Sequence, residues 1–173
     1  MIRPIARNLS ISGTFIGLLA ACLTAATVPH WWSVAPLLVS LLLGGIDERA
    51  VSRRLVTDQL RSTLAATADR ISEVLWAVAF YRLGASVAWV LAFASLAGFQ
   101  EYAKVRLVSI GMGKPRLTSM ADRNVRGGSL FIAILLYQFA PVHTWVTGLA
   151  VAMTIAQAVS FIFLLRFAYK QLH

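Results

Sequence analysis

Residues 143–167 read HTWVTGLAVAMTIAQAVSFIFLLRF, a run with no charged side chain before Arg166. About 20 apolar residues in a helix span the hydrocarbon core of a bilayer, so this run predicts a membrane-spanning helix. Five further apolar runs precede it, at 9–28, 31–47, 64–83, 85–105 and 124–140. The run at 124–140 is the weakest, because its purely apolar stretch is short enough for a buried or interfacial segment.

The composition of the whole chain agrees with a membrane protein. Apolar residue types make up 58% of its 173 residues, and the mean hydropathy is +0.73. A soluble domain of this length is far less apolar. The sequence therefore predicts an all-α membrane protein, in which residues 1–173 form a single domain of six transmembrane helices.

The distribution of basic residues predicts the orientation of these spans. With six spans, the basic residues near the N-terminus, those of the two longer loops and Lys170 all fall on one side, whereas Arg82 is the only basic residue on the other. The positive-inside rule then places both termini in the cytoplasm, in a multi-pass protein of the cell membrane. The net charge of +9 is therefore a topological signal, and a nucleic-acid partner is not expected. Cys22 is the single cysteine, which excludes an internal disulfide and a thiolate metal cluster.

Acidic residues near the cytoplasmic ends of two successive spans are the candidate functional groups. Asp69 and Glu73 are four positions apart and therefore share one helical face, while Asp47 ends the preceding span. Ionisable groups at membrane depth usually face a bundle interior or a wet cavity. A pocket at the inner face is one interpretation. The alternative is that Asp69 and Glu73 simply pair with Arg70 or Arg61 at the membrane edge.

Asp47 and Asp69 are 22 positions apart, and their spacing and flanks resemble the second and fourth acids of DxxDGxxAR-x8-GxxxDxxxD. This motif is the signature of the CDP-alcohol phosphatidyltransferases. EYAKVR at 101–106 is similar to the family segment SYxRAR. ADRNVR at 121–126 resembles the segment xERPxR of the family's phosphatidylglycerophosphate and phosphatidylinositol-phosphate synthase branch. NLSIS at 8–12 resembles the family's N-terminal segment NxLT. The resemblance covers nearly the whole chain and implies a six-helix bundle with both ends inside.

The resemblance also implies a reaction linked to phospholipid biosynthesis, in which CDP-diacylglycerol donates its phosphatidyl group to an alcohol and CMP leaves. Two Mg²⁺ or Mn²⁺ ions on the motif carboxylates would stabilise the developing charge. By position, Asp47 and Asp69 are metal ligands, and Asp69 is also the base that takes the hydroxyl proton. Basic residues fall where the acceptor's phosphate would bind: Lys104, Arg106, Arg123 and Arg126. Their alternative roles are topology-setting charge and contact with lipid headgroups.

Most of the signature is nevertheless missing. Gly44 and Ala65 stand at the first and third acids. The remaining departures are Glu48 and Arg61 in place of glycines, and Val51 and Ser52 in place of the Ala-Arg pair. Of the eight fixed positions, only Asp47 and Asp69 survive. Mg²⁺ demands several oxygen ligands, so we expect divalent metal binding to be weak or absent.

Charge leads to the same expectation. Five acids and five arginines lie between Gly44 and Glu73 and cancel, so two divalent ions would leave four uncompensated positive charges before a diphosphate binds. The sequence predicts a catalytically impaired or inactive family member, a partner or ligand-binding subunit in contact with membrane lipids that forms a homodimer or a heterodimer with an active relative. The alternative is an active phosphatidylglycerophosphate-type synthase in which Glu48 binds metal and Arg61 replaces one ion. A small transporter subunit is a third hypothesis.

Overall fold

The structure is a computed structural model that describes the backbone of residues 2–52, 59–110, 123–139 and 143–172, and the side chains of 13–43, 63–64, 66–110, 123–139 and 143–170. Every regular element within these ranges is a helix, which confirms the predicted all-α class. The elements are α1 (Ile2–Thr27), a 3-10 turn η1 (Trp31–Ser33), α2 (Val34–Ser52), α3 (Gln59–Arg82), α4 (Val87–Ser109), α5 (Arg123–Phe139) and α6 (His143–Leu172).

Each of the six apolar runs corresponds to one α-helix, and α1, α2, α3, α4 and α6 extend beyond their runs. The second run was expected to end at residue 47, whereas α2 continues to Ser52. Similarly, α3 begins at Gln59 instead of residue 64. No Gly or Pro lies between residues 48 and 63 to stop a helix, so the polar turns that flank the apolar runs remain helical.

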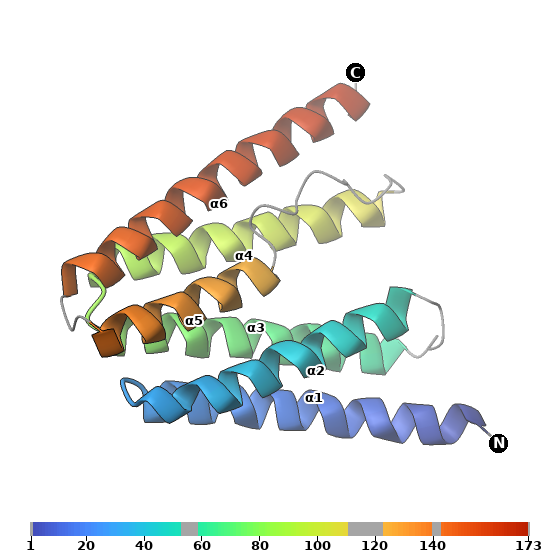
Figure 1. The fold of residues 1–173 in the computed structure, drawn as a ribbon. Helices are drawn as coiled ribbons and strands as arrows, with labels where there is room; N and C mark the ends of the chain where they lie inside the picture. Colours follow the sequence, from blue (N-terminus) through green and yellow to red (C-terminus); the bar gives the residue numbers. More distant parts are fainter. Residues whose placement is uncertain (1, 53–58, 111–122, 140–142, 173) are drawn as a thin grey trace.

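The helices alternate in direction, and both chain ends lie at the same end of the bundle (Figure 1). The connections at 28–33 and 83–86 lie at the opposite end. The helix α1 packs mainly against α2 and α3, whereas α4 packs mainly against α6. Between these two groups lies α5, which contacts α2, α3 and α6. This position brings the start of α5 next to the acidic turn of α3.

The turn between α3 and α4 has a clear local cause. Gly84 has φ +93°, a left-handed conformation that glycine adopts without a Cβ penalty. Its N–H donates to the Tyr81 carbonyl at 2.9 Å, and the Ala85 N–H donates to the Phe80 carbonyl at 3.1 Å. These two bonds form the Schellman motif that ends many helices. Arg82 donates a hydrogen bond to the Ala25 carbonyl and so ties this end of α3 to the end of α1.

The apolar core occupies the half of the bundle near this turn. Its largest fully buried side chains come from α3 and α5, with contributions from α2 and α6: Trp76, Phe80, Leu83, Leu130, Ile134, Leu37 and Val146. Gly127 of α5 lies so close to Leu41 of α2 that an added Cβ would come within 2.2 Å of the leucine Cδ2. The charged side chains of α3, α4 and α5 gather in the other half, apart from Arg82.

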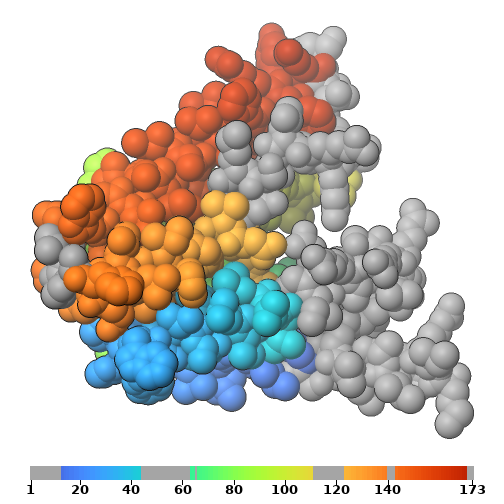
Figure 2. All heavy atoms as spheres, viewed as in Figure 1, coloured from blue at the N-terminus to red at the C-terminus, as the bar shows by residue number. Residues whose placement is uncertain are grey.

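Several small and polar side chains are buried beside this core, and many large apolar side chains are exposed. Thr24, Ser40 and Gln157 are among the buried polar residues, whereas large apolar side chains are exposed on every helix. Figure 2 shows the face of the molecule on which α2, α5 and α6 lie. Helix contacts in membranes are enriched in small residues.

One helix of the described part is long and apolar enough to cross a membrane by itself. It is His143–Lys170 within α6, with a mean hydropathy of 2.1. The apolar stretches Gly13–Thr27 and Trp31–Leu43 are shorter. The finding agrees with the predicted membrane association, and the six-span topology stays a prediction.

Candidate functional site

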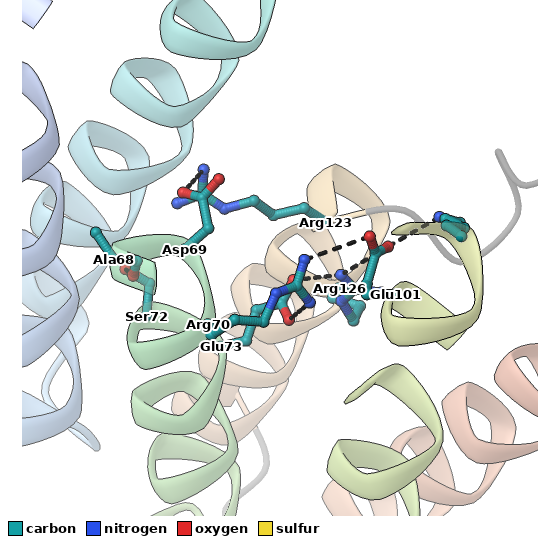
Figure 3. Close-up of polar contacts among 9 residues, drawn as sticks. Ala68, Asp69, Arg70, Ser72, Glu73, Glu101, Arg123 and Arg126 are labelled. Atoms are coloured by element: carbon teal, nitrogen blue, oxygen red, sulfur yellow. Dashed lines mark hydrogen bonds and ion pairs between the residues drawn. The ribbon is translucent and has the colours of Figure 1, made fainter. Parts of the chain in front are cut away.

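Seven charged side chains from three helices form ion pairs in this region, and we refer to them as the ion-pair cluster: Asp69, Arg70 and Glu73 of α3, Glu101 and Lys104 of α4, and Arg123 and Arg126 of α5. Asp69 and Arg123 form one pair, and the other five residues form a network. Figure 3 shows how the α3 and α5 side chains point toward one another. The cluster lies between the middle of α3, the last turns of α4 and the first turn of α5. It is the largest concentration of charge among the described side chains.

Asp69 is held by an arginine. Its Oδ1 lies 2.7 Å from Nη1 of Arg123, on the first turn of α5. The guanidinium of Arg123 also lies over the ring of Trp76, with 5.4 Å between Cζ and the ring centroid. A guanidinium within about 6 Å of an indole face is attracted to it. Arg123 is therefore fixed from two sides, by a carboxylate and by a buried aromatic ring of α3.

Glu73 is the centre of a second set of contacts. Its Oε1 accepts a hydrogen bond from Arg126, and its Oε2 accepts one from Nη1 of Arg70 at 2.7 Å. The side chain of Arg126 is only 2% exposed and that of Glu73 is 11% exposed. A buried arginine is expensive unless a carboxylate compensates its charge. This pair therefore fixes α5 against α3 in a single register.

Glu101 of α4 completes the cluster. Its carboxylate lies 2.8 Å from Nζ of Lys104, 3.3 Å from Arg70 and 4.0 Å from Arg126. The salt bridge with Lys104 joins neighbouring turns of one helix, whereas the contacts with Arg70 and Arg126 join three helices. Four cations and three carboxylates take part in these contacts.

The predicted phosphate-binding cations have different surroundings. Lys104, Arg123 and Arg126 are each paired with a carboxylate of this chain, and their phosphate-binding role stays a prediction. Arg106 is exposed on the last turn of α4. The proposed alternative for the acids is confirmed for Glu73, which pairs with Arg70. For Asp69, the described partner is Arg123 instead.

Several predicted positions lie outside the described side chains. Asp47, Glu48, Gly44, Val51 and Ser52 belong to the helical backbone of α2, and Arg61 and Ala65 to that of α3. Their side chains are not among those described. The proposed metal-ligand roles of Asp47 and Glu48 accordingly stay predictions.

The described residues do not fit a two-ion metal site. Ala65 and Gly44 have no side-chain ligand atom, and the Asp69 carboxylate already accepts the Arg123 guanidinium. Among the described side chains, no three His, Cys, Asp or Glu residues gather closely enough to hold a metal ion. We therefore derive no metal-dependent step for this cluster.

The sequence interpretation missed two residues of this site. Glu101 is the α4 carboxylate that joins Arg70, Lys104 and Arg126, and Trp76 supports Arg123. A carboxylate inside an otherwise apolar run is a signal for Glu101, because such groups usually have a partner in the bundle interior. Trp76 has no comparable signal in the sequence, since a tryptophan in an apolar run is ordinary.

A cavity of about 90 Å³ opens beside the cluster. Arg70, Glu73 and Arg126 form its polar lining, and Trp76 and Phe93 are among its apolar lining residues. Its polar end thus contains two cations and one carboxylate. This combination suits an anionic group attached to an apolar one.

Comparisons with known proteins found no match. This holds for protein-family models, for curated proteins and for solved structures. The resemblance to the CDP-alcohol phosphatidyltransferases therefore continues to depend on the motif residues alone.

Proposed function

We propose that this chain is a multi-pass membrane protein with both termini in the cytoplasm. The support is the distribution of side chains, with large apolar groups exposed on every helix and polar groups such as Gln100, Thr154 and Gln157 buried. An exposed apolar surface of this extent must be shielded from water. The acyl chains of a lipid bilayer can surround an entire helix bundle and shield it on all sides. The alternating helices and the shared end of both termini are compatible with six spans (Figure 1).

The further proposal is a CDP-alcohol phosphatidyltransferase-like protein that has lost, or retains only weakly, the metal-dependent transfer. The contact between Asp69 and Arg123 at 2.7 Å carries this proposal. A divalent ion about 4 Å from a guanidinium would be repelled by roughly 8 kcal/mol at an effective dielectric constant of ~20, twice the value for two unit charges. Metal binding at Asp69 thus requires Arg123 to leave both its carboxylate and the Trp76 ring.

The role that follows is ligand binding or partnership with an active enzyme of phospholipid biosynthesis. Arg123 supplies at Asp69 the positive charge that a metal ion would supply in an active relative. In this proposal, arginine side chains in place of metal ions neutralise the carboxylates of the cluster, and the cluster joins three helices without a cofactor. The cavity beside Arg70 and Arg126 is the candidate place for a ligand.

A CMP-release assay tests the proposed loss of transfer. Purified protein with CDP-diacylglycerol, glycerol 3-phosphate and Mg²⁺ or Mn²⁺ is expected to release no CMP above a protein-free control. The physical reason is that Asp69 is neutralised by Arg123 and lacks the neighbouring acids of the signature. The Asp69→Asn variant serves as the matched control, and the amount of CMP that it releases should equal that released by the wild type. Metal-dependent CMP release that disappears in Asp69→Asn would instead establish an active synthase.

A further inference from the structure

The exposed tryptophans of this chain gather at one end of the bundle. Of the five tryptophans, the exposed ones are Trp31, Trp32, Trp89 and Trp145. Each lies in the first turn of its element, which is η1, α4 or α6. Tyr81, in the last turn of α3, is exposed as well. These turns lie at the end of the bundle opposite the two termini (Figure 1), and we name the five residues the aromatic belt.

Hydrogen bonds between the connections hold this end of the bundle together. The Ser86 N–H donates to Oγ1 of Thr147 at 3.3 Å and so joins the starts of α4 and α6. Gln138, near the end of α5, donates to the carbonyl of Pro29, just before η1. The bond from Arg82 described above joins the end of α3 to the end of α1. The belt residues therefore lie at one level along the bundle.

The aromatic belt is distributed around the bundle. Its residues come from α3 and η1, next to α1 and α2, and from α4 and α6, which lie on the other side of α5. A protein partner, including a second copy of this chain, would cover one side of such a belt. A bilayer surrounds a bundle at one level, and the amphipathic rings of Trp and Tyr are enriched where its headgroups meet its acyl chains.

The distance from the belt to the nearest basic residue of α6 matches the thickness of a bilayer. No charged residue lies between Trp145 and Arg166, which are about 32 Å apart at ~1.5 Å per residue. In α1, no charged residue lies between Arg7 and Thr27, and this distance is about 30 Å. The hydrocarbon core of a bilayer is also ~30 Å thick. Of the charged side chains that the structure describes, Arg82 alone lies at the belt end.

The belt also indicates how deep the ion-pair cluster lies. Glu73 is eight positions from Tyr81 on α3, or about 12 Å, and Glu101 is twelve positions from Trp89 on α4, or about 18 Å. Both distances fall within the hydrocarbon core. Ionisable groups at such a depth usually pair with one another. The two carboxylates agree with this rule, because each has a cationic partner in the structure.

We propose that the aromatic belt binds the headgroup region of the outer leaflet of a bilayer, one hydrocarbon thickness from the turns that contain Arg7 and Arg166. This inference rests on the proposed membrane location and adds the depth at which the bundle sits. The polar atoms of the rings contact headgroups and water, and their apolar parts contact the acyl chains. The belt thereby holds the Glu73–Arg126 pair inside the hydrocarbon core.

Nitroxide labels measure this depth in the full chain, reconstituted in phosphatidylcholine vesicles. The ratio of collisions with oxygen to collisions with a water-soluble nickel chelate rises with depth. In a Cys22→Ser background, three variants carry the label at an exposed position of a different helix, two or three residues from the belt: Val78→Cys, Leu91→Cys and Gly148→Cys. All three should lie within about 5 Å of the belt level. Ile155→Cys, midway between Trp145 and Arg166, should be the deepest on α6, at about 15 Å.

Cys22 gives a further value in the wild-type chain. It is exposed and lies five positions before the end of α1, so its label should lie no more than about 8 Å below the belt level. Unequal depths of the three labels near the belt, or a deepest position of α6 away from Ile155, would overturn the belt and leave the membrane location intact. Labels that the nickel chelate reaches freely at every position would defeat the membrane location itself.

Tryptophan fluorescence provides a measurement without a label. Phosphatidylcholine brominated near its glycerol should quench the emission more strongly than phosphatidylcholine brominated near the ends of its chains, because four of the five tryptophans belong to the belt. Trp76→Phe removes the buried tryptophan and should leave this order unchanged. Stronger quenching by the deeper bromines in both proteins would contradict the proposed level.

Discussion

Glu73→Leu is expected to destabilise the protein by about 3–5 kcal/mol, the usual effect of breaking a buried ion pair by removing one partner. The substitution removes the carboxylate that accepts both Arg126 and Arg70. Arg126, which is almost fully buried, would retain Glu101 at 4.0 Å. Unfolding free energies from SDS titration in mixed micelles measure the loss.

The double variant Glu73→Leu/Arg126→Leu provides the control. Replacement of a whole buried pair by apolar side chains of similar volume is often close to neutral, so the double variant should be more stable than Glu73→Leu alone. The difference between the variants reports the coupling of the pair. A double variant less stable than the single one would show that the stability loss does not come from removing the Glu73 carboxylate from the buried Arg126.

Trp76→Ala is expected to destabilise the protein by about 3–5 kcal/mol, the range for removal of a large aromatic side chain from a core. Trp76 is 2% exposed and is the largest fully buried side chain of the described part. Its loss also removes the ring over which Arg123 lies, an interaction of about 0.5–2 kcal/mol. The same SDS titration measures the change.

Trp145→Ala is the matched control for this prediction. Trp145 is 63% exposed, and substitutions at such surface positions usually change stability by less than about 0.5 kcal/mol. Similar losses for the two tryptophan variants would contradict the placement of Trp76 in the core. A loss confined to Trp76→Ala agrees with it.

The helices could be predicted from the sequence because their signal is local. A run of apolar residues identifies each helix, and the turn at Gly84 lies between the runs expected at 64–83 and 85–105. The lengths of α2 and α3 were underestimated at their polar ends. An apolar run shows only which part of a helix is apolar, and the helix can continue into polar residues. The pattern also predicted both termini at one end, as Figure 1 shows.

The site was predicted only in part, because contacts between helices depend on register. The sequence predicted Asp69, Arg123 and Arg126 on the same side of the membrane, and the structure pairs Arg123 with Asp69 and Arg126 with Glu73. It could not tell whether the arginines face a free pocket or the carboxylates, because that depends on how far α5 slides along α3. The Glu101 contacts depend on the register of α4 in the same way.

Manganese binding tests the central claim, that Arg123 and not a metal ion neutralises Asp69. Electron paramagnetic resonance follows the free Mn²⁺ signal during titration of the purified protein. The account predicts that wild-type protein and Asp69→Asn leave the same concentration of free Mn²⁺ at every point. Binding of two ions per chain by the wild type, with a spin-coupled spectrum that Asp69→Asn abolishes, would contradict it.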